Sequence, residues 1–273
     1  MCTLLDTILD PGSLAPVFQP IFEIRGQERE LHSLECLMRG PKGTSVELAN
    51  ILFAYVRLKR EEIAVDRACV RAALQAAALL PCEPRISVNV HASTLGRDAG
   101  FVSYLKSLAN ECGIAPRRVT VELIEHAPFW DVAGIWRAID QLRASDMRLA
   151  VDDVGAGQSN YNMILDCRPD ALKVDAYVVR GCHADKHRVA VLESIITLAR
   201  KFGSQIIAEG IEQVEDLEVL LGLGINLIQG YMLARPMSVE SLLQSDLLTK
   251  GEMAQVAHAP EVGMHFSNGL ARS

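Results

Sequence analysis

The amino-acid sequence predicts an α/β protein built as a modified (β/α)8 TIM barrel with one antiparallel strand. Eight short apolar segments have the length of strands, and a segment of helical periodicity follows nearly every one. A short polar turn, Arg25 to Glu28, joins the first two strands. Because a parallel crossover needs roughly a dozen residues or more, these two strands should form an antiparallel hairpin.

The predicted strands are rich in β-branched and aliphatic residues and end near turn-forming residues. The second one alternates, with Glu35, Leu37 and Arg39 on one face and Cys36 and Met38 on the other. In chain order the strands are Val17–Ile24, Leu31–Arg39, Ile86–Val90, Val119–Ile124, Leu149–Val151, Ala171–Val174, Gln205–Ala208 and Ile225–Gln229.

Helices are predicted between these strands, and the clearest is His187–Phe202, which has one apolar face and ends at Gly203. The others are Val46–Glu61, Ile63–Leu80, Gly100–Glu111, Trp130–Arg143, Val214–Leu221 and Ser238–Leu247. We expect residues 13–248 to form the barrel domain. Residues 1–12 would be an N-terminal segment or linker remnant, and 249–273 a mobile C-terminal tail.

The amino-acid composition argues against several classes of protein. Hydrophobic residues make up 49% of the 273 residues and charged residues 22%, which is enough for a large core. The formal net charge of -7 argues against binding to a DNA or RNA backbone. The seven cysteines form no CxxC pair, and no apolar run approaches the ~20 residues of a membrane helix. We expect a cytoplasmic protein with reduced thiols.

Two adjacent carboxylates, Asp152 and Asp153, follow the predicted strand Leu149–Val151. At ~4 Å and an effective dielectric constant of ~20, two like charges repel by about 4 kcal/mol. A divalent cation would offset that repulsion. The alternative is an ordinary turn containing Asp, and this segment alone leaves both interpretations open.

Other strand ends carry further polar residues, and a (β/α)8 barrel brings such ends together at one mouth. They are Glu35 with Arg39, Asn89, Glu122, Lys173 with Asp175, Glu209 and Gln229. Five carboxylates meeting there could not all stay ionised without cations. Oxygen and amide ligands favour Mg²⁺ or Mn²⁺. His91 and His126 also follow strand ends, but they show no metal-ligand spacing.

These residues also carry a family resemblance. Glu35-Cys36-Leu37-Met38-Arg39 resembles the signature of the EAL domain, the cyclic di-GMP phosphodiesterase family, with Cys36 in place of the usual Ala. The resemblance spans about Pro16 to Met237. Its other motifs are Phe18-Gln19-Pro20-Ile21, Ser87-Val88-Asn89-Val90, Glu122-Leu123-Ile124-Glu125, Asp152-Asp153, Lys173-Val174-Asp175, Glu209-Gly210-Ile211-Glu212 and Gln229-Gly230-Tyr231.

The resemblance implies a role for each motif. One metal ion would be held by Glu35, Asn89, Glu122 and Asp152, and a second by Asp152, Asp153 and Glu209. Lys173 would hold or activate the attacking water, and the catalytic set would be Lys173, Glu35, Asp153 and Glu209. Cyclic di-GMP would contact Gln19, Leu37, Arg39, Asp175, Glu212 and Gln229. Glu125 would support the loop after Asp153.

The resemblance also implies a homodimer, and an upstream sensory domain or regulatory partner stays open. The loop after Asp153 departs from the family, with Val154 for Phe, Gln158 for an aromatic residue and Asn160 for Ser. This loop favours an alternative function, a cyclic di-GMP receptor with weak or no turnover that signals through a partner. A third alternative is an unrelated barrel enzyme that stabilises an enolate with a metal.

Overall fold

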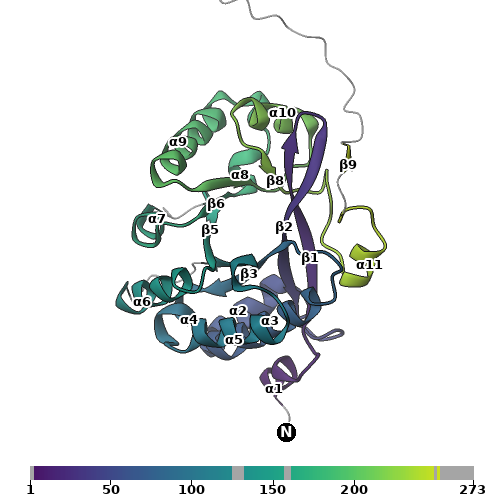
Figure 1. Cartoon of the computed structure of the whole chain (residues 1–273), viewed down its shortest axis with the longest axis vertical. Coiled ribbons are helices and arrows are strands. Elements are labelled where there is room, and N and C mark those ends of the chain that lie inside the picture. Colours follow the sequence, from purple (N-terminus) through teal and green to yellow (C-terminus); the bar gives the residue numbers. More distant parts are fainter. Residues whose placement is uncertain (1–2, 125–131, 157–160, 249–250, 253–273) are drawn as a thin grey trace, which may run out of the picture.

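Eight strands of the chain close into a barrel, with the helices outside it (Figure 1). The computed structural model describes residues 3–124, 132–156, 161–248 and 251–252. The strands are β1 (Ala15–Arg25), β2 (Glu28–Arg39), β3 (Arg85–His91), β4 (Val119–Ile124), β5 (Arg148–Val154), β6 (Ala171–Val174), β7 (Gln205–Ala208) and β8 (Leu227–Ile228). The predicted (β/α)8 architecture is confirmed.

Strand β1 is the antiparallel member of the barrel. It pairs antiparallel with β2 on one side and with β8 on the other, while the other neighbouring pairs of the barrel are parallel. The turn between β1 and β2 consists of Gly26 and Gln27, and Gly26 has a φ of 62°, which a glycine adopts without strain. So short a connection allows only the predicted hairpin.

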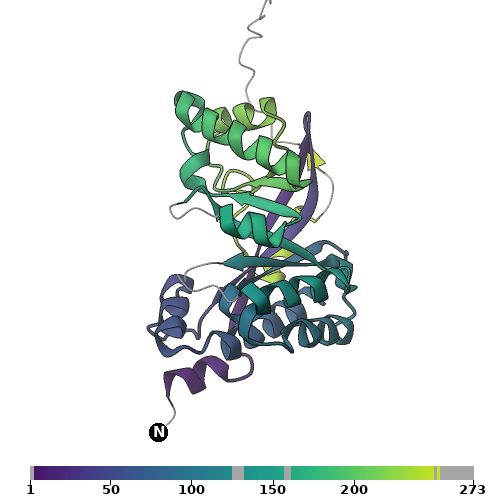
Figure 2. The same cartoon turned by 90° about the vertical axis from the view of Figure 1, so that its left-hand side faces the viewer.

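The helices cover the outside of the ring, and those of the two halves of the chain lie toward opposite ends of the long axis (Figure 2). The longer ones are α2 (Ala49–Lys59), α3 (Glu62–Ala77), α5 (Phe101–Glu111), α6 (Val132–Arg143), α9 (Lys186–Phe202) and α10 (Val214–Gly222). They match the predicted helices within about three residues, the precision expected at helix ends. The last predicted helix, Ser238–Leu247, is shorter in the structure, as α11 (Val239–Leu243).

Short helices were not predicted, because one or two turns carry too little periodicity to be seen in a sequence. They are α1 (Leu4–Leu9), α4 (Ala92–Arg97), α7 (Tyr161–Cys167) and α8 (Ala176–Val179), with 3-10 helices η1 (Pro116–Arg118) and η2 (Cys182–Ala184). Helix α1 begins at a capping box formed by Thr3 and Asp6. Two residues of the predicted tail form β9 (Gly251–Glu252), which pairs with the start of β2.

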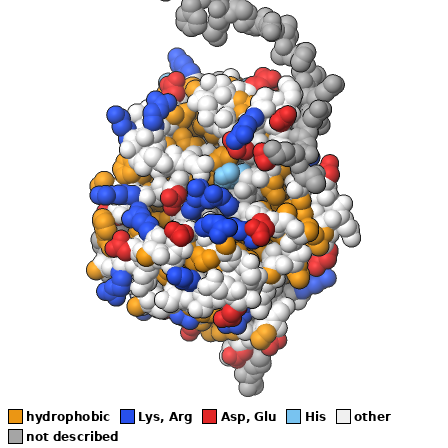
Figure 3. All heavy atoms as spheres, viewed as in Figure 1, with side chains coloured by type: hydrophobic (Ala, Val, Ile, Leu, Met, Phe, Trp, Pro, Cys, Tyr) orange, Lys and Arg blue, Asp and Glu red, His pale blue; other side chains and the backbone are white. Residues whose placement is uncertain are grey.

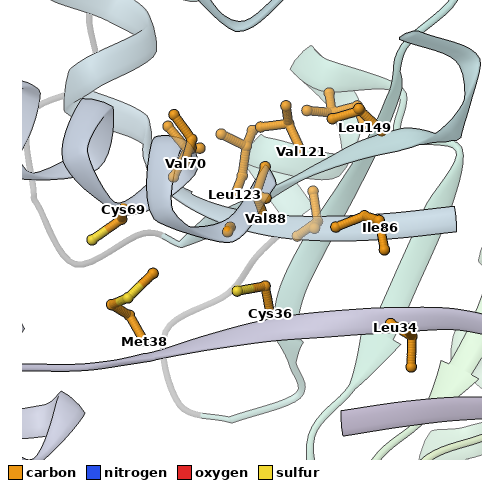
Figure 4. Close-up of a cluster of buried hydrophobic side chains, with 14 of the residues drawn as sticks. Leu34, Cys36, Met38, Cys69, Val70, Ile86, Val88, Val121, Leu123 and Leu149 are labelled. Carbon is orange, nitrogen blue, oxygen red and sulfur yellow. The ribbon is translucent and has the colours of Figure 1, made fainter. Parts of the chain in front are cut away.

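The main core lies between the strands and the helices. Side chains of β2, β3 and β4 that point out of the barrel meet Cys69 and Val70 of α3 (Figure 4). The alternation predicted for β2 is present, because Cys36 and Met38 lie in this core and Glu35 faces into the barrel. A smaller cluster inside the barrel contains Ile21, Ala150, Ala171, Ile207 and Leu227. None of the helices in the described ranges is long and apolar enough to cross a bilayer.

Candidate active site

Side chains from the carboxyl ends of the strands surround one buried ammonium group, that of Lys173 on β6. Lys173 is 1% exposed. Its Nζ lies 2.7 Å from Glu122 Oε2, 2.7 Å from Glu209 Oε1, 3.1 Å from Glu35 Oε2 and 3.2 Å from Asp152 Oδ1. The closed barrel thus brings together four acids from β2, β4, β5 and the residue after β7.

Two amide side chains hold Glu35 in this cluster. Asn89 Nδ2 donates to Glu35 Oε1 at 3.0 Å, and Gln229 Nε2 donates to Glu35 Oε2 at 2.7 Å. Because Asn89 lies in β3 and Gln229 follows β8, the carboxylate is oriented from both sides of the ring. Hydrogen bonds to the charged form stabilise a buried carboxylate, so Glu35 can stay ionised here.

The pKa values of the cluster show that the positive charge of Lys173 only partly offsets the negative charge of the surrounding carboxylates. Burial lowers the pKa of Lys173, but the four surrounding carboxylates outweigh this effect and raise it well above its ordinary value. Burial raises the pKa of Glu122 to about 8 and also raises the pKa values of Asp152 and Glu209, because the attraction of Lys173 offsets desolvation only in part. One ammonium group therefore does not neutralise all the acids.

Glu35 behaves differently. Burial raises its pKa, but the attraction of Lys173 and the two amide donors together outweigh burial and lower it. At the rim of the cluster, burial raises the pKa of Asp153 to about 6, with further repulsion from Asp152 and Asp175. A divalent cation placed between these acids would favour their ionised forms.

Two groups of acids have a spacing suitable for a metal ion. The ligand oxygens of Glu35, Glu122 and Asp152 lie within 4.8 Å of one another, and so do those of Asp152, Asp153 and Glu209. Among the described residues, the buried oxygens Glu122 Oε1 and Asn89 Oδ1 have no hydrogen-bond partner. Buried polar atoms without a partner are uncommon, so these oxygens fit a ligand role toward a hard cation.

The backbone at Asp153 is unusual. Its φ is 54°, a left-handed conformation that is costly for most residues other than glycine, and its N–H donates to Asp152 Oδ1 at 3.0 Å. Two residues later, Gly155 has a φ of 98°, and a Cβ there would lie 2.5 Å from Val178 Cγ2. The loop after the two aspartates therefore needs a glycine at this position, for its backbone and for the contact with α8.

Two cavities adjoin the acidic cluster, and both are lined by Glu35, Leu37 and Asp152. One, of about 230 Å³, is largely apolar and reaches Phe53 of α2. The other, of about 250 Å³, is more polar and is also lined by Gln19, Arg180, Gln229 and Tyr231. Together they have the volume of a small-molecule site, with the acids between an apolar and a polar part.

The predicted substrate-binding residues lie at different places around these cavities. Gln19, Leu37 and Gln229 line the polar cavity, and Gln19 Nε2 donates to the Ala234 carbonyl at 3.1 Å. Arg39 is the last residue of β2, and its guanidinium donates at 3.4 Å to the carbonyl of Met38. Within the described part of the chain, Arg39 is not among the residues that line either cavity.

Two more of these residues have structural partners. Asp175 caps α8, with Oδ1 accepting from the Tyr177 N–H at 2.7 Å. Glu212 Oε1 forms an ion pair of 2.7 Å with Arg180 Nη2. Arg180 also lines the polar cavity and was missed in the sequence, where nothing marks a surface arginine after a four-residue helix.

Tyr231 is a second residue of the cavity without a predicted role, although it belongs to a motif quoted for the resemblance. It is 47% exposed, and Arg235 lies over its ring at 4.4 Å. Among the histidines, His91 is buried and its Nδ1 is bound to Asp66 Oδ1 at 2.9 Å. Glu125, His126, Gln158 and Asn160 lie outside the described residues.

The family model of the EAL domain matches residues 2–236. The chain belongs to the EAL domain family. Curated relatives include the cyclic di-GMP phosphodiesterase PdeL of Escherichia coli, 30% identical over 63% of this chain and 48% of PdeL. The probable cyclic di-GMP phosphodiesterase PdeA of E. coli is 28% identical over 85% of this chain and 32% of PdeA. The chain thus spans less than half of the length of either relative.

Solved EAL structures resemble this domain along most of its length. Klebsiella pneumoniae BlrP1, in a complex with calcium and cyclic di-GMP, has a TM-score of 0.73 and 28% identity, covering 84% of this chain and 57% of BlrP1. A standalone EAL protein of Vibrio cholerae with bound cyclic di-GMP has a TM-score of 0.73 and 25% identity, covering 83% of this chain and 93% of that protein. Both comparisons agree with the family membership.

Proposed function

We propose that this EAL domain is a metal-dependent phosphodiesterase that hydrolyses cyclic di-GMP to linear pGpG. The observation that carries the proposal is the convergence of five carboxylates, an unpartnered amide oxygen and a buried lysine at one barrel mouth. The names of the relatives PdeL and PdeA and the cyclic di-GMP bound by two structural neighbours support this substrate.

Two Mg²⁺ or Mn²⁺ ions fit the ligand set, and the BlrP1 structures with calcium or manganese support a divalent ion in this family. We assign the first ion to Glu35, Asn89, Glu122 and Asp152, and the second to Asp152, Asp153 and Glu209. When bound, such a pair lowers the pKa of water and stabilises negative charge on a phosphodiester.

The protein's own groups then position the reaction. Lys173 has a raised pKa and three N–H donors, which supports a role as a fixed donor to the attacking water rather than as a base. Leu37 lines both of the cavities that we assign to the two halves of the dinucleotide. Arg39, Asp175 and Glu212 would contact the substrate at the rim, with Arg39 on a phosphate. Water adds to one phosphorus and the 3′ oxygen leaves, which opens the ring to pGpG.

A hydrolysis assay tests this proposal. The purified domain with Mg²⁺ or Mn²⁺ should convert cyclic di-GMP to pGpG, measured by liquid chromatography. Glu35→Ala should reduce the rate at least ~100-fold, because it removes a ligand and a partner of Lys173. Glu193→Ala, on the exposed face of α9, is the matched control and should keep the wild-type rate. If the folded protein binds cyclic di-GMP but yields no pGpG with either metal, the proposed phosphodiesterase activity is wrong.

The receptor function is the alternative outcome of the same assay. It would show cyclic di-GMP binding without turnover, and signalling through a partner would survive Glu35→Ala. The homodimer and a regulatory partner or sensory domain also stay predictions, and light scattering of the purified domain tests the first. We further expect the residues 13–248 to suffice for activity.

A further inference from the structure

The amino-terminal mouth of the barrel, opposite the acidic cluster, carries a second polar cavity. It is lined by the first residues of several strands and by Glu122, which lies between the two ends of the barrel. Its volume of about 20 Å³ is enough for one water-sized group. The residues with functional groups at this mouth include His32, Ser33, Arg85, Ser87, Thr120 and Arg148.

Positive charge gathers at this mouth. Arg85 begins β3 and Arg148 begins β5, and both line the cavity together with His32 of β2. Figure 3 shows Lys and Arg side chains and a histidine near the centre of the face that it draws, with Asp and Glu side chains beside them. Such a group of cations at the non-catalytic end of a (β/α)8 barrel is unexpected, because that end usually serves stability alone.

The two arginines are not matched by carboxylates. Arg148 Nη1 donates to the neutral Gln205 Oε1 at 2.9 Å, and within the described ranges Arg85 forms no ion pair. One acid, Asp170, lies on the rim, and its Oδ2 accepts from the Leu149 N–H at 2.9 Å. At the floor, Glu122 is already paired with Lys173. The mouth therefore keeps an excess of positive charge.

The directions of the pKa shifts of these side chains agree with that excess of positive charge. Burial lowers the pKa of Arg85, and repulsion from Arg148 lowers it further, more than Asp170 raises it. Burial also lowers the pKa of His32, and the charges of Arg85 and Arg148 lower it further, while Glu23 raises it. The two arginines therefore repel each other in a partly buried surrounding, and a bound anion would relieve this repulsion.

Hydroxyl groups provide further donors inside the cavity. Ser33 Oγ lies 3.1 Å from His32 Nδ1. Ser87 is 3% exposed and also lines the cavity. A serine hydroxyl both donates and accepts hydrogen bonds, so Ser33 and Ser87 can contact a group that enters the cavity.

We propose that the amino-terminal mouth of the barrel binds an oxyanion of the phosphate or sulfate type, held by Arg85, Arg148 and His32. A guanidinium group binds such an anion through parallel N–H donors. Arg85 and Arg148 line the same opening, so both can contact one anion. One oxygen of the anion fits the cavity and the Ser87 hydroxyl, and the rest of the anion lies on the rim. This site is separate from the proposed phosphodiesterase and does not depend on it.

Titration calorimetry at constant ionic strength, with a chelator to remove divalent ions, tests the site. The probes are sulfate, orthophosphate and glycerol 2-phosphate. We expect one saturable site in the wild-type chain and at least ~10-fold weaker binding in Arg85→Gln and Arg148→Gln. Arg117→Gln, an exposed arginine near the same end, should bind like the wild type. Binding of glycerol 2-phosphate as well would indicate a phosphate ester, and binding of orthophosphate alone a free ion.

Circular dichroism checks that each variant is folded, and Arg85→Lys is a milder variant that keeps the charge but loses the planar fork. It should bind the anions with an intermediate affinity. The proposal is wrong if none of the three probes binds the folded wild-type chain saturably, or if Arg85→Gln and Arg148→Gln bind unchanged. Loss of binding in Arg39→Gln instead would place the anion at the acidic mouth and equally overturn it.

Discussion

Lys173 is the residue around which the charges of the acidic mouth are arranged. Its ammonium contacts four carboxylates within 3.2 Å, and it is almost fully buried. A buried ion pair adds little net stability, but removal of one partner leaves an uncompensated charge and is strongly destabilising. Lys173 therefore keeps the site assembled in the absence of metal, in addition to any role in catalysis.

Lys173→Met should lower the free energy of unfolding by about 3–5 kcal/mol in the presence of a chelator, because the remaining carboxylates repel one another. Mg²⁺ or Mn²⁺ should restore part of the loss by supplying positive charge to the same acids. Urea unfolding with and without the ions measures both effects. Lys201→Met, on the exposed side of α9, is the control, and equal unfolding midpoints for the two variants would contradict the prediction.

The residue that caps the C-terminal end of a helix differs between α2 and α9. Helix α2 ends at Arg60, which has a φ of 59°, and the Arg60 N–H is bonded to the carbonyls of Val56 and Arg57. Glycine is the usual residue in this left-handed position, as Gly203 is at the end of α9. An arginine there is tolerated at a conformational cost.

Arg60→Gly should raise the free energy of unfolding by about 1 kcal/mol, because glycine adopts a positive φ without a Cβ clash. The matched control is Lys59→Gly, one residue earlier, where helical backbone makes glycine unfavourable by about 1 kcal/mol. Urea denaturation should thus move the midpoints of these variants in opposite directions. A destabilised Arg60→Gly would mean that the arginine side chain makes a contact that outweighs the backbone strain.

Asp216 of α10 is joined to Gly181 and to His183 of η2 by partly buried hydrogen bonds. Its carboxylate accepts from the Gly181 N–H at 2.9 Å and from the backbone and the ring of His183 at 3.1 and 2.7 Å. Burial raises the pKa of Asp216, but these donors outweigh burial and lower it. The carboxylate therefore contributes stability above its unfolded pKa of about 4, and the contribution is lost as the pH falls through the lower folded pKa.

Asp216→Asn should lower the free energy of unfolding at pH 7 by roughly 1–3 kcal/mol, because the donors of Gly181 and His183 then lose a charged acceptor. Near pH 3 and below, the gap to the wild type should narrow, because the wild-type carboxylate is then becoming protonated as well. Urea unfolding across this pH range measures the gap. Asp140→Asn, on an exposed position of α6, should show no gap at either pH. A constant gap would contradict the role of the charge.

At the scale of the whole molecule, the antiparallel β1 closes the barrel by pairing with both β2 and β8. The described hydrophobic core extends along the chain from Ile8 to Leu242, and α11 contributes Val239 and Leu242 to it. The isolated bridge between Phe18 and Met237 joins the segment before α11 to β1. The described core therefore includes α11, and Leu247 and Leu248 after this helix also pack against the core.

A chain that ends at Leu248 should fold with a melting temperature within about 3 °C of that of the full chain, because it retains the described core. A chain that ends at Met237 loses the buried Val239 and Leu242 and should melt more than about 6 °C lower. Calorimetry of both chains measures the difference. Equal melting temperatures for the two truncations would move the boundary of the barrel domain away from residue 248.

Much of the fold was predictable because its signals are local. Strand length, helical periodicity and the two-residue turn before β2 are encoded within a few residues, and these signals also imply the barrel and its antiparallel strand. Short helices such as α4 and α8 were not predictable, because a turn or two of helix is stabilised by neighbours that only the folded chain supplies. Strand β8 was predicted, as Ile225–Gln229, but it is shorter in the structure and has only Leu227 and Ile228.

By itself, the sequence determined which acids, amides and cations stand at the ends of strands, and it placed the chain in a family through their order. Only the tertiary structure decided how they combine: Gln229 orients Glu35 across 194 positions of sequence, and Lys173 contacts four acids at once. The basic cavity formed by Arg85 and Arg148 at the opposite mouth was likewise hidden in the sequence. The physical reason is that periodicity reports the environment of each residue separately, whereas charge balance arises only when the closed barrel sets the distances between residues.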